Sequence, residues 1–330
     1  MESPRNPEPG TLKTIAHYTL LERMGESAIG EVYRARDLKA GRTVAVKLAP
    51  ETLFPDAAAR RDFLQDARAA ATLSHPNIAT LFDMDEHEQG FYLAYEFAFG
   101  VTLRQETAGG AVSSRRAVEL ASQVADALAY AHAQGVLHGD LRPDTILVTK
   151  KGSAKVLEFG MAYWTHGGQA RIRVAARPDS AGENVATTVS YMSPEQASGG
   201  TVDARTDVFS LGVILYEMLS GRNPLAAPTA AETLANVVSR TPLPVLSDSA
   251  LTPDLAEVVA RGVARDVEAR YQSAASFSAE LRRVGAILDV RAGESGPREL
   301  LIEEEVSGAG KWWAIAAGAA VLAALGWWMF

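Results

Sequence analysis

The spacing of hydrophobic and polar residues changes along the chain. Over residues about 17 to 48 the two kinds alternate, with glycines at turn-like positions, which is typical of antiparallel strands. Residues 56–73 (DAAARRDFLQDARAAATL) have helical spacing, and GFYLAYEF is typical of a further strand. From about residue 113 onward helical patterns dominate. A strand-rich N-terminal part and a helix-rich C-terminal part predict an α+β fold with two lobes.

The C-terminal end has another pattern, because the 19 residues 312–330, WWAIAAGAAVLAALGWWMF, carry no charge. As a helix they span roughly 28 Å, which matches the hydrocarbon core of a bilayer, and tryptophans flank both ends. We expect a single-pass C-terminal membrane anchor with the rest of the chain in the cytoplasm; the alternative is a buried terminal helix. Small residues four positions apart permit two such helices to pair in a homodimer, the alternative being an unpaired alanine-rich anchor.

These patterns divide the chain into four parts. We expect a polar tail over 1–16, a two-lobed domain over 17–285, an acidic juxtamembrane linker over 286–311 and the membrane helix over 312–330. The lobes would cover 17–98 and 99–285. The formal net charge of −8 argues against a nucleic-acid partner, which requires a basic face. The absence of cysteine excludes disulfides, thiolate zinc sites and a cysteine nucleophile.

A glycine-containing hairpin carries the first sign of chemistry. MGESAIGEVYRARD follows a strand-like run, and Lys47 lies further along in VAVKL. Glycines let backbone N–H groups approach phosphate oxygens, and a lysine on the next strand reaches the same phosphates. Alone, such a loop is more often an ordinary β-turn.

Four later segments occur in a fixed order: HGDLRPDTILV, KVLEFG, YMSPEQ and DVFSLGVILYEMLSGRNP. With the hairpin and VAVKL they resemble the protein kinase family, most closely bacterial membrane-anchored Ser/Thr kinases, over about residues 17–285. The resemblance implies a bilobal fold with an antiparallel β N-lobe, a mainly α C-lobe and ATP in the cleft. It also implies Mg²⁺ as a cofactor and a protein substrate or signalling partner.

The resemblance assigns catalytic and metal-binding roles to particular residues. Lys47 would anchor the phosphates of ATP, Asp140 would orient the substrate hydroxyl, and Arg142 would stabilise developing charge. Thr145 and Glu158 fall at the two metal-ligand positions. The nucleotide-binding positions that the resemblance implies are Gly25, Ser27, Gly30, Val32, Ala45, Lys47, Asp66, Glu96, Ala98 and Leu147.

Other residues match parts of the family pattern that support the site. Asp66 lies where the family has a helix glutamate that pairs with the lysine, and Tyr95 lies at the gatekeeper position. The hinge that meets adenine would run from Glu96 to Ala98. The resemblance implies structural roles for a Glu195–Arg270 pair, for Asp207 and, as a core residue, for His138.

Several positions depart from the family pattern. Ser27 replaces a loop glycine, Gly139 replaces the arginine that reads a phosphorylated activation loop, and Arg142 replaces a lysine. Asp66 is one methylene shorter than the usual glutamate. Thr145 replaces an asparagine and Glu158 an aspartate, so both metal ligands are altered. Mg²⁺ demands near-ideal octahedral geometry, and we therefore expect impaired positioning of the metal.

Three functions remain open from the sequence. The first is a slow Ser/Thr protein kinase that uses ATP, and the second is a pseudokinase that acts as a signalling scaffold or allosteric partner. The third is a small-molecule kinase, because HGD also opens the catalytic loop of that class. Residues 158–195 would form a long activation loop in which Ser180 and Thr187 are candidate phosphosites, the alternative being a solvated polar loop.

Overall fold

The computed structural model describes residues 13–27, 29–54, 56–88, 90–161, 183–239, 241, 243–244, 246 and 251–291. The chain divides into two compact units, 1–288 and 289–330. The predicted membrane helix over 312–330 and the linker beyond residue 291 lie outside the described residues. Among the helices that the structure describes, none is both long and apolar enough to cross a bilayer.

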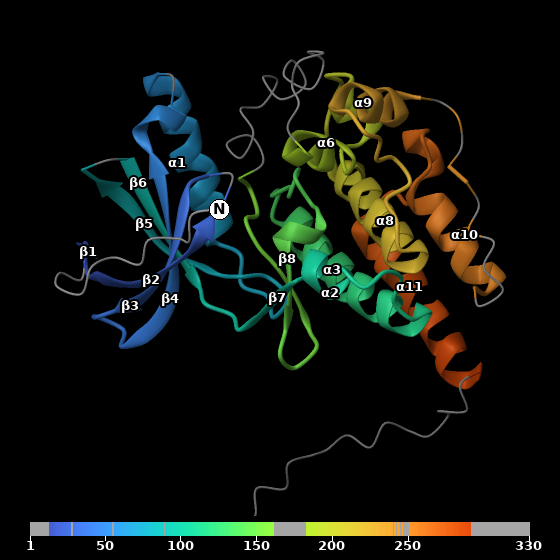
Figure 1. The fold of residues 1–330 in the computed structure, drawn as a ribbon, viewed down its shortest axis with the longest axis horizontal. Coiled ribbons are helices and arrows are strands. Elements are labelled where there is room, and N and C mark those ends of the chain that lie inside the picture. The colour runs from blue at the N-terminus through green and yellow to red at the C-terminus, as the bar shows by residue number, and fades with distance from the viewer. Residues whose placement is uncertain are drawn as a thin grey trace, which may run out of the picture. The chain divides into compact units, whose positions relative to one another are not determined.

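The predicted antiparallel N-lobe is confirmed as a six-stranded sheet of order β1-β2-β3-β4-β6-β5 (Figure 1). Its strands are β1 (Thr14–Ile15), β2 (Tyr18–Glu26), β3 (Glu31–Asp37), β4 (Arg42–Pro50), β5 (Leu81–His87) and β6 (Gly90–Glu96). Alternation along β4 buries Val44, Val46 and Leu48 in one apolar cluster, while Lys47 points to the opposite face. The sheet thereby presents Lys47 to the interior of the lobe.

One helix covers this sheet: α1 (Ala57–Ala71), which follows the short turn η1 (Glu51–Leu53). Asp56 caps its N-terminus by accepting hydrogen bonds from the N–H groups of Ala58 and Ala59, each at 2.8 Å. The helix buries Phe63, Ala67 and Ala70 in an apolar cluster with strand residues. Packing on the sheet therefore fixes the position of α1.

The C-lobe is built around α8 (Ala204–Ser220), whose residues are buried on nearly all sides. Helices α3 (Ser114–Ala133) and α10 (Pro253–Gly262) pack against it (Figure 1). Gly212 and Gly262 permit the contact with α10, because a Cβ on Gly212 would lie 2.7 Å from the carbonyl carbon of Gly262. The other elements of this lobe are α2 (Leu103–Glu106), α6 (Glu183–Val189), α7 (Pro194–Ala197), α9 (Ala230–Val238), η3 (Val267–Ala269) and α11 (Ala274–Arg291).

A second, three-stranded sheet lies between the two parts in Figure 1. It consists of β7 (Gly100–Thr102), β8 (Ile146–Thr149) and β9 (Ala154–Val156), and the turn η2 (Pro143–Thr145) leads into β8. The loop over 138–142 therefore joins the helical lobe to this sheet, and β9 runs directly into Glu158. This arrangement brings HGDLRPD and LEFG to the border of the lobes.

The segment expected to be an irregular activation loop is partly helical, because 183–189 form α6. Thr187 and Thr188 lie on this helix, and Thr188 is buried. Residues 162–182, which include the candidate phosphosite Ser180, lie outside the described residues.

Candidate active site

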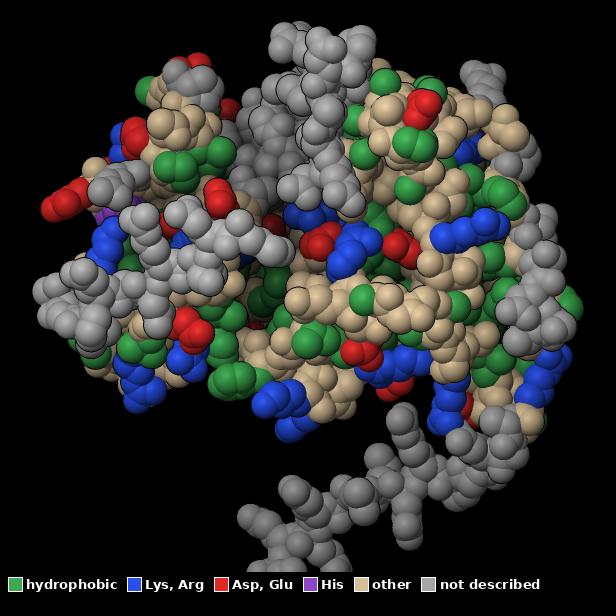
Figure 2. Space-filling view, in the orientation of Figure 1, with side chains coloured by type: hydrophobic (Ala, Val, Ile, Leu, Met, Phe, Trp, Pro, Cys, Tyr) green, Lys and Arg blue, Asp and Glu red, His purple; other side chains and the backbone are tan. Residues whose placement is uncertain are grey.

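A cavity of about 220 Å³ lies between the strands that carry Lys47 and the β8 strand. It is lined by Met24, Ser27, Val32, Ala45, Lys47, Ala79, Tyr95, Glu96, Phe97, Ala98, Asp144, Leu147, Leu157 and Glu158. The walls are largely apolar, and four charged side chains, Lys47, Glu96, Asp144 and Glu158, also line them. Mostly apolar lining with a few polar groups is usual for small-molecule sites. Figure 2 shows acidic and basic side chains together in the middle of the face where the two lobes meet.

Many of the predicted positions meet in this cavity. They are Ser27, Val32, Ala45, Lys47, Glu96, Ala98, Leu147 and Glu158. Met24, Ala79 and Leu157 also line it but were not predicted, whereas Phe97 lies within the predicted hinge and Asp144 was considered only as a substitute metal ligand. Leu157 could have been inferred from its place before Glu158.

Gly25, Gly30, Asp66, Asp140, Arg142 and Thr145 do not line the cavity. Gly30 acts through the backbone of the hairpin, since a Cβ on it would overlap the carbonyl oxygen of Leu48, whereas a Cβ on Gly25 would meet nothing. Ser27 closes the hairpin tip: its hydroxyl donates to the carbonyl of Gly30 at 3.1 Å and accepts from the N–H of Ile29 at 3.3 Å. The side chain of Ser27 therefore stabilises the hairpin tip through these two hydrogen bonds.

Tyr95 supplies a polar atom without a protein partner. Among the described residues, nothing hydrogen-bonds to its hydroxyl, which is buried, and burial raises its pKa. Buried polar groups normally have a partner. A ligand or water in the cavity would satisfy this hydroxyl, which supports a binding function for the cavity.

Lys47 and Glu158 form a buried ion pair at the charged end of the cavity, with 8% of each side chain exposed. Burial, and then the positive charge of Arg142, lower the pKa of Lys47 to about 7. The carboxylate of Glu158 acts in the opposite direction, because a neighbouring negative charge favours the ammonium form. An ammonium in this position therefore depends on its counterion.

The structure differs here from the sequence prediction, which paired Lys47 with Asp66. The carboxylate that contacts the ammonium comes from Glu158. Asp66 lies on α1, whose backbone packs against the turn after Glu158: the carbonyl oxygen of Asp66 is 3.3 Å from where a Cβ on Gly160 would lie. The helix is close to the site, yet the longer side chain from the turn reaches the lysine.

The backbone at Glu158 adopts an unusual conformation. Its φ of 63° lies in the left-handed region, which non-glycine residues occupy at a cost of about 1–3 kcal/mol when the surroundings enforce it. Gly160 is also left-handed and its N–H donates to the carbonyl of Leu137 at 3.2 Å, while the N–H of Met161 donates to the carbonyl of Glu158 at 3.2 Å. Phe159 is buried against the ring of His138. These contacts hold the turn and point Glu158 toward Lys47.

Asp207 anchors the loop that carries Asp140. Its carboxylate accepts hydrogen bonds from the backbone N–H groups of His138 and Gly139, and lies 2.8 Å from the Nε2 of His132. Burial raises the pKa of Asp207, but hydrogen bonding to His132 and the nearby histidines lower it on balance. The structural role predicted for Asp207 is therefore confirmed, and His138 is a buried core residue as predicted.

Gly139 fits this loop because its φ is 70°, a conformation that glycine adopts without steric cost. Its carbonyl accepts a hydrogen bond from Nε2 of Gln196 at 2.7 Å, and its N–H is bonded to Asp207. The loop is thus tied to α7 and α8 by protein groups at the position where the family pattern has an arginine.

The predicted catalytic residues form a chain of charges beside the cavity. Arg142 lies 3.4 Å from Asp140 through Nε and 3.2 Å from Asp144 through Nη1. Asp144 also pairs with Arg104 at 3.0 Å. Asp140 is buried, and Arg142 places a fixed positive charge next to it.

Thr145 does not present its side chain to the cavity. Its hydroxyl donates to the carbonyl of Arg142 at 3.0 Å and accepts from the N–H of Arg142 at 3.1 Å. The side chain is buried within the loop. The structure therefore gives no support to Thr145 as a metal ligand, whereas the neighbouring Asp144, which sequence analysis did not select, lines the cavity with Glu158.

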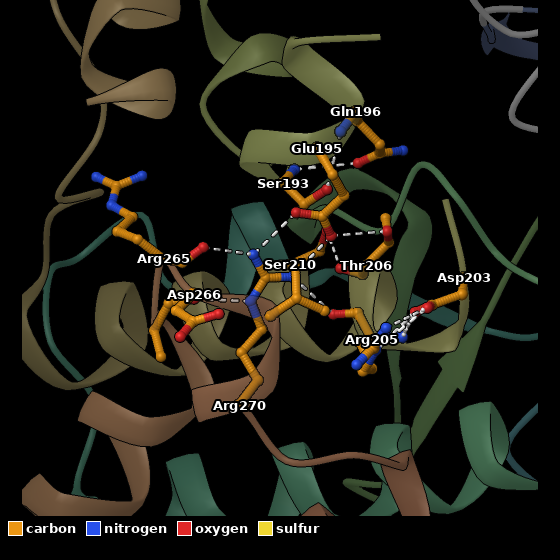
Figure 3. A network of polar contacts seen from close by, with 12 residues as sticks. Ser193, Glu195, Gln196, Asp203, Arg205, Thr206, Ser210, Arg265, Asp266 and Arg270 are labelled. Atoms are coloured by element: carbon orange, nitrogen blue, oxygen red, sulfur yellow. Dashed lines mark hydrogen bonds and ion pairs between the residues drawn. The ribbon is translucent and has the colours of Figure 1, made fainter. Parts of the chain in front are cut away.

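Away from the cavity, the predicted Glu195–Arg270 pair is confirmed (Figure 3). The guanidinium donates two parallel hydrogen bonds to the carboxylate, at 2.7 and 2.9 Å, and Arg270 is fully buried. Burial raises the pKa of Glu195, but the contact with Arg270 lowers it on balance. This pair ties α7 to the segment before α11 and has a structural role.

Comparison with known proteins agrees with this geometry. The chain matches the protein kinase domain over residues 18–277, and so it belongs to the protein kinase family. It is 37% identical over 274 residues to the serine/threonine-protein kinase PknB of Mycolicibacterium smegmatis, which covers 81% of this chain and 43% of the relative. It is 29% identical over 267 residues to the serine/threonine-protein kinase PrkC of Bacillus subtilis, covering 80% of this chain and 40% of the relative.

A solved structure is also similar: a mutant form of the kinase domain of Mycobacterium tuberculosis PknI, with a TM-score of 0.62 and 26% identity. The match covers 84% of this chain and 98% of that one. The predicted resemblance to bacterial Ser/Thr protein kinases is thus confirmed. The chain spans less than half the length of the two curated relatives.

Protein kinases use Mg²⁺, so we ask whether the oxygen-bearing side chains of the cavity could bind this ion. Within the part of the chain that the structure describes, no group of three or more His, Asp or Glu side chains is arranged to hold a metal. Two carboxylates, Asp144 and Glu158, nevertheless line the same cavity. Mg²⁺ commonly binds through one or two carboxylates, several waters and the substrate phosphates. The residues therefore fit a Mg²⁺ ion that is held mainly by the phosphates of a nucleotide.

Proposed function

We propose that this chain binds ATP in the cavity beside Lys47 and transfers its γ-phosphate slowly to Ser or Thr residues of a protein. The observation that carries the proposal is the convergence of the Lys47–Glu158 pair and an apolar pocket in a protein kinase domain. The names of the relatives, which are serine/threonine-protein kinases, support the same reaction. The match to this domain also favours a protein over a small-molecule acceptor.

Each residue of the chain has a distinct role in this proposal. The apolar walls enclose adenine, and the Lys47 ammonium binds phosphate oxygens. Asp140 accepts a hydrogen bond from the substrate hydroxyl and orients it for attack on the γ-phosphorus, and Arg142 stabilises the negative charge that develops. Mg²⁺, when bound, neutralises charge on the phosphates; Glu158 and Asp144 would hold it.

The low rate follows from the altered metal-facing positions. Thr145 uses its hydroxyl within the loop, and Glu158 uses its carboxylate to hold Lys47. A metal ion then competes with Lys47 for Glu158 and has Asp144 in place of Thr145, so it is positioned less well than the family pattern provides. A misplacement of about 1 Å at the reacting centre costs on the order of 10²-fold in rate.

A pseudokinase function is the second candidate, and the same ion pair favours it. Because Glu158 occupies the ammonium of Lys47, phosphates must compete for that contact. In this case the nucleotide, if bound, would only set the shape of the domain, and the protein would act as a scaffold or allosteric partner.

The experiment that decides between them is the double substitution Thr145→Asn with Glu158→Asp in the full chain. We expect transfer of phosphate from ATP to a pool of Ser/Thr peptides to rise on the order of 10–100-fold, because both metal ligands regain the family pattern. Asp140→Asn is the control and should abolish transfer in both backgrounds. An unchanged rate in the double variant, and also after Asp66→Glu is added to it, would show that the metal-ligand argument is wrong.

We further propose that residues 312–330 anchor the chain in a membrane, with the kinase domain in the cytoplasm. The uncharged length and the flanking tryptophans support this proposal. We expect a chain lacking 312–330 to move from the membrane fraction to the soluble fraction of lysed cells. Retention of the truncated chain in the membrane fraction would contradict the anchor.

A further inference from the structure

We propose that Glu158, rather than the acid of helix α1, is the residue that positions Lys47 for phosphate binding. This inference rests on the proposed function of the cavity as a nucleotide site. Glu158 would then serve two purposes: it orders the lysine before the nucleotide arrives, and it faces the metal position afterwards.

The contact itself is the first support. Within the described residues, the carboxylate of Glu158 is the hydrogen-bond and ion-pair partner of the Lys47 ammonium. The ammonium also lies over the ring of Tyr95, whose centre is 5.5 Å away. Both members of the pair line the cavity, so the ordered ammonium faces the space that phosphates would occupy.

Helix α1 provides the second support, because its position depends on apolar packing. Phe63, Ala67 and Ala70 share one buried cluster with Met161, which follows the turn at Glu158. The backbone of α1 also touches the turn at Gly160. Apolar packing therefore keeps the helix next to the site.

Side-chain length provides the third support. At position 66 the acid is one methylene shorter than the family pattern, and at position 158 it is one methylene longer. One methylene corresponds to roughly 1.3–1.5 Å of reach. The two changes are reciprocal: the acid on α1 is shorter and extends less far toward Lys47, and the acid in the turn is longer and extends further. The left-handed backbone of Glu158 directs that reach toward β4.

The test measures the ordering of Lys47 directly. The chain has seven lysines, so the ε-methylene signals of ¹³C-labelled lysine are few enough to resolve by NMR in the full chain, kept in solution with a mild detergent. Lys47→Arg assigns the signal. The buried pair predicts a rigid Lys47, with an order parameter approaching that of rigid backbone, about 0.85, whereas a flexible side chain would fall below about 0.6.

Glu158→Asp is the central variant, because it keeps the charge and removes only the reach. We expect it to lower the order parameter of Lys47 into the flexible range, whereas Asp66→Asn should leave it unchanged. Asp66→Glu combined with Glu158→Asp should restore a rigid Lys47, since α1 then regains the length it lacks. Lys155, which pairs with Glu96 at 2.8 Å, is the internal control and should stay constant in every variant.

Two results would overturn the proposal: a rigid Lys47 in Glu158→Asp, or a loss of order in Asp66→Asn as large as in Glu158→Asp. Failure of the double variant to restore order would overturn the reciprocal exchange. If Glu158→Asp unfolds, which a change at Lys155 would reveal, Glu158→Gln keeps the length and removes the charge, and it should also release Lys47.

The proposal and the proposed function fail separately. The NMR readout needs neither metal nor phosphate transfer, so an inactive chain can still show that Glu158 orders Lys47. Conversely, if the kinase remains slow with Thr145→Asn and Glu158→Asp but becomes faster when Asp66→Glu is added, positioning of Lys47 limits the rate. A faster rate after Asp66→Glu is added would support the proposal. If the variant with Thr145→Asn and Glu158→Asp is active and Asp66→Glu brings no further gain in rate, the result would count against the proposal.

Discussion

Two ion pairs of this domain, Glu195–Arg270 and Lys47–Glu158, each join a buried cation to a carboxylate but lie in different surroundings. Arg270 also donates to the backbone carbonyls of Ala264 and Arg205 at 2.7 and 3.2 Å (Figure 3). Lys47 has no such additional acceptors among the residues that the structure describes, and its pair borders a cavity. The first pair is saturated by protein groups, whereas a ligand can compete for the second.

This difference separates stability from function. A buried pair that is fully hydrogen-bonded within the protein holds elements together, and removing one partner leaves a charge with no solvation. A pair that borders a cavity can exchange one partner for a phosphate or a metal. The comparison therefore assigns the structural role to the pair in the C-lobe and the functional role to the pair beside the cavity.

The largest expected effect comes from truncating the two cations to the same side chain. Arg270→Met should lower the free energy of unfolding by about 3–5 kcal/mol, because it leaves the Glu195 carboxylate, whose side chain is 13% exposed, without its cation. Lys47→Met should cost only about 1–3 kcal/mol, since Glu158 borders the cavity, but it should abolish nucleotide binding. Urea unfolding and nucleotide titration measure both quantities. Equal losses of stability would contradict the division of roles.

A smaller effect is expected at Gly139, which connects the two regions. Gly139→Ala should cost about 1–2 kcal/mol, because alanine resists the left-handed backbone. It should also lower phosphate transfer, since the glycine is bonded to Asp207 and Gln196 beside Asp140. Gly199→Ala is the matched control: its φ is 68° with open space around it, so it should cost similar stability and leave transfer unchanged. If both variants lost activity equally, strain alone would explain the effect.

Much of the fold and most of the pocket were predictable, because the ordered motifs identify a kinase domain and fix which residues meet. The Glu195–Arg270 pair and the anchoring of the loop by Asp207 followed from the same motifs. The partner of Lys47 was not predictable, because it depends on about one bond length of reach and on the left-handed backbone at Glu158. Thr145 shows the same limit: its residue type permits a ligand, but hydrogen bonds within the loop turn its hydroxyl away.

Helix α6 was missed for a related reason. Its sequence, ENVATTV, contains β-branched residues that have no strong preference for helix. Its neighbours in the C-lobe, among them α9, provide the packing that its own propensity lacks. Contacts between distant segments thus decided both the local structure here and the choice of partner at Lys47.

The most direct test of the account is a thermal-shift titration of the full chain with ATP, with and without Mg²⁺. A ligand that binds only the folded state raises its apparent melting temperature, by an amount that corresponds to about 2.7 kcal/mol at one hundred times the dissociation constant. The account predicts a shift with ATP that increases when Mg²⁺ is added, because Glu158 and Asp144 still face the metal position. No shift, or a shift that is the same with and without Mg²⁺, would contradict it.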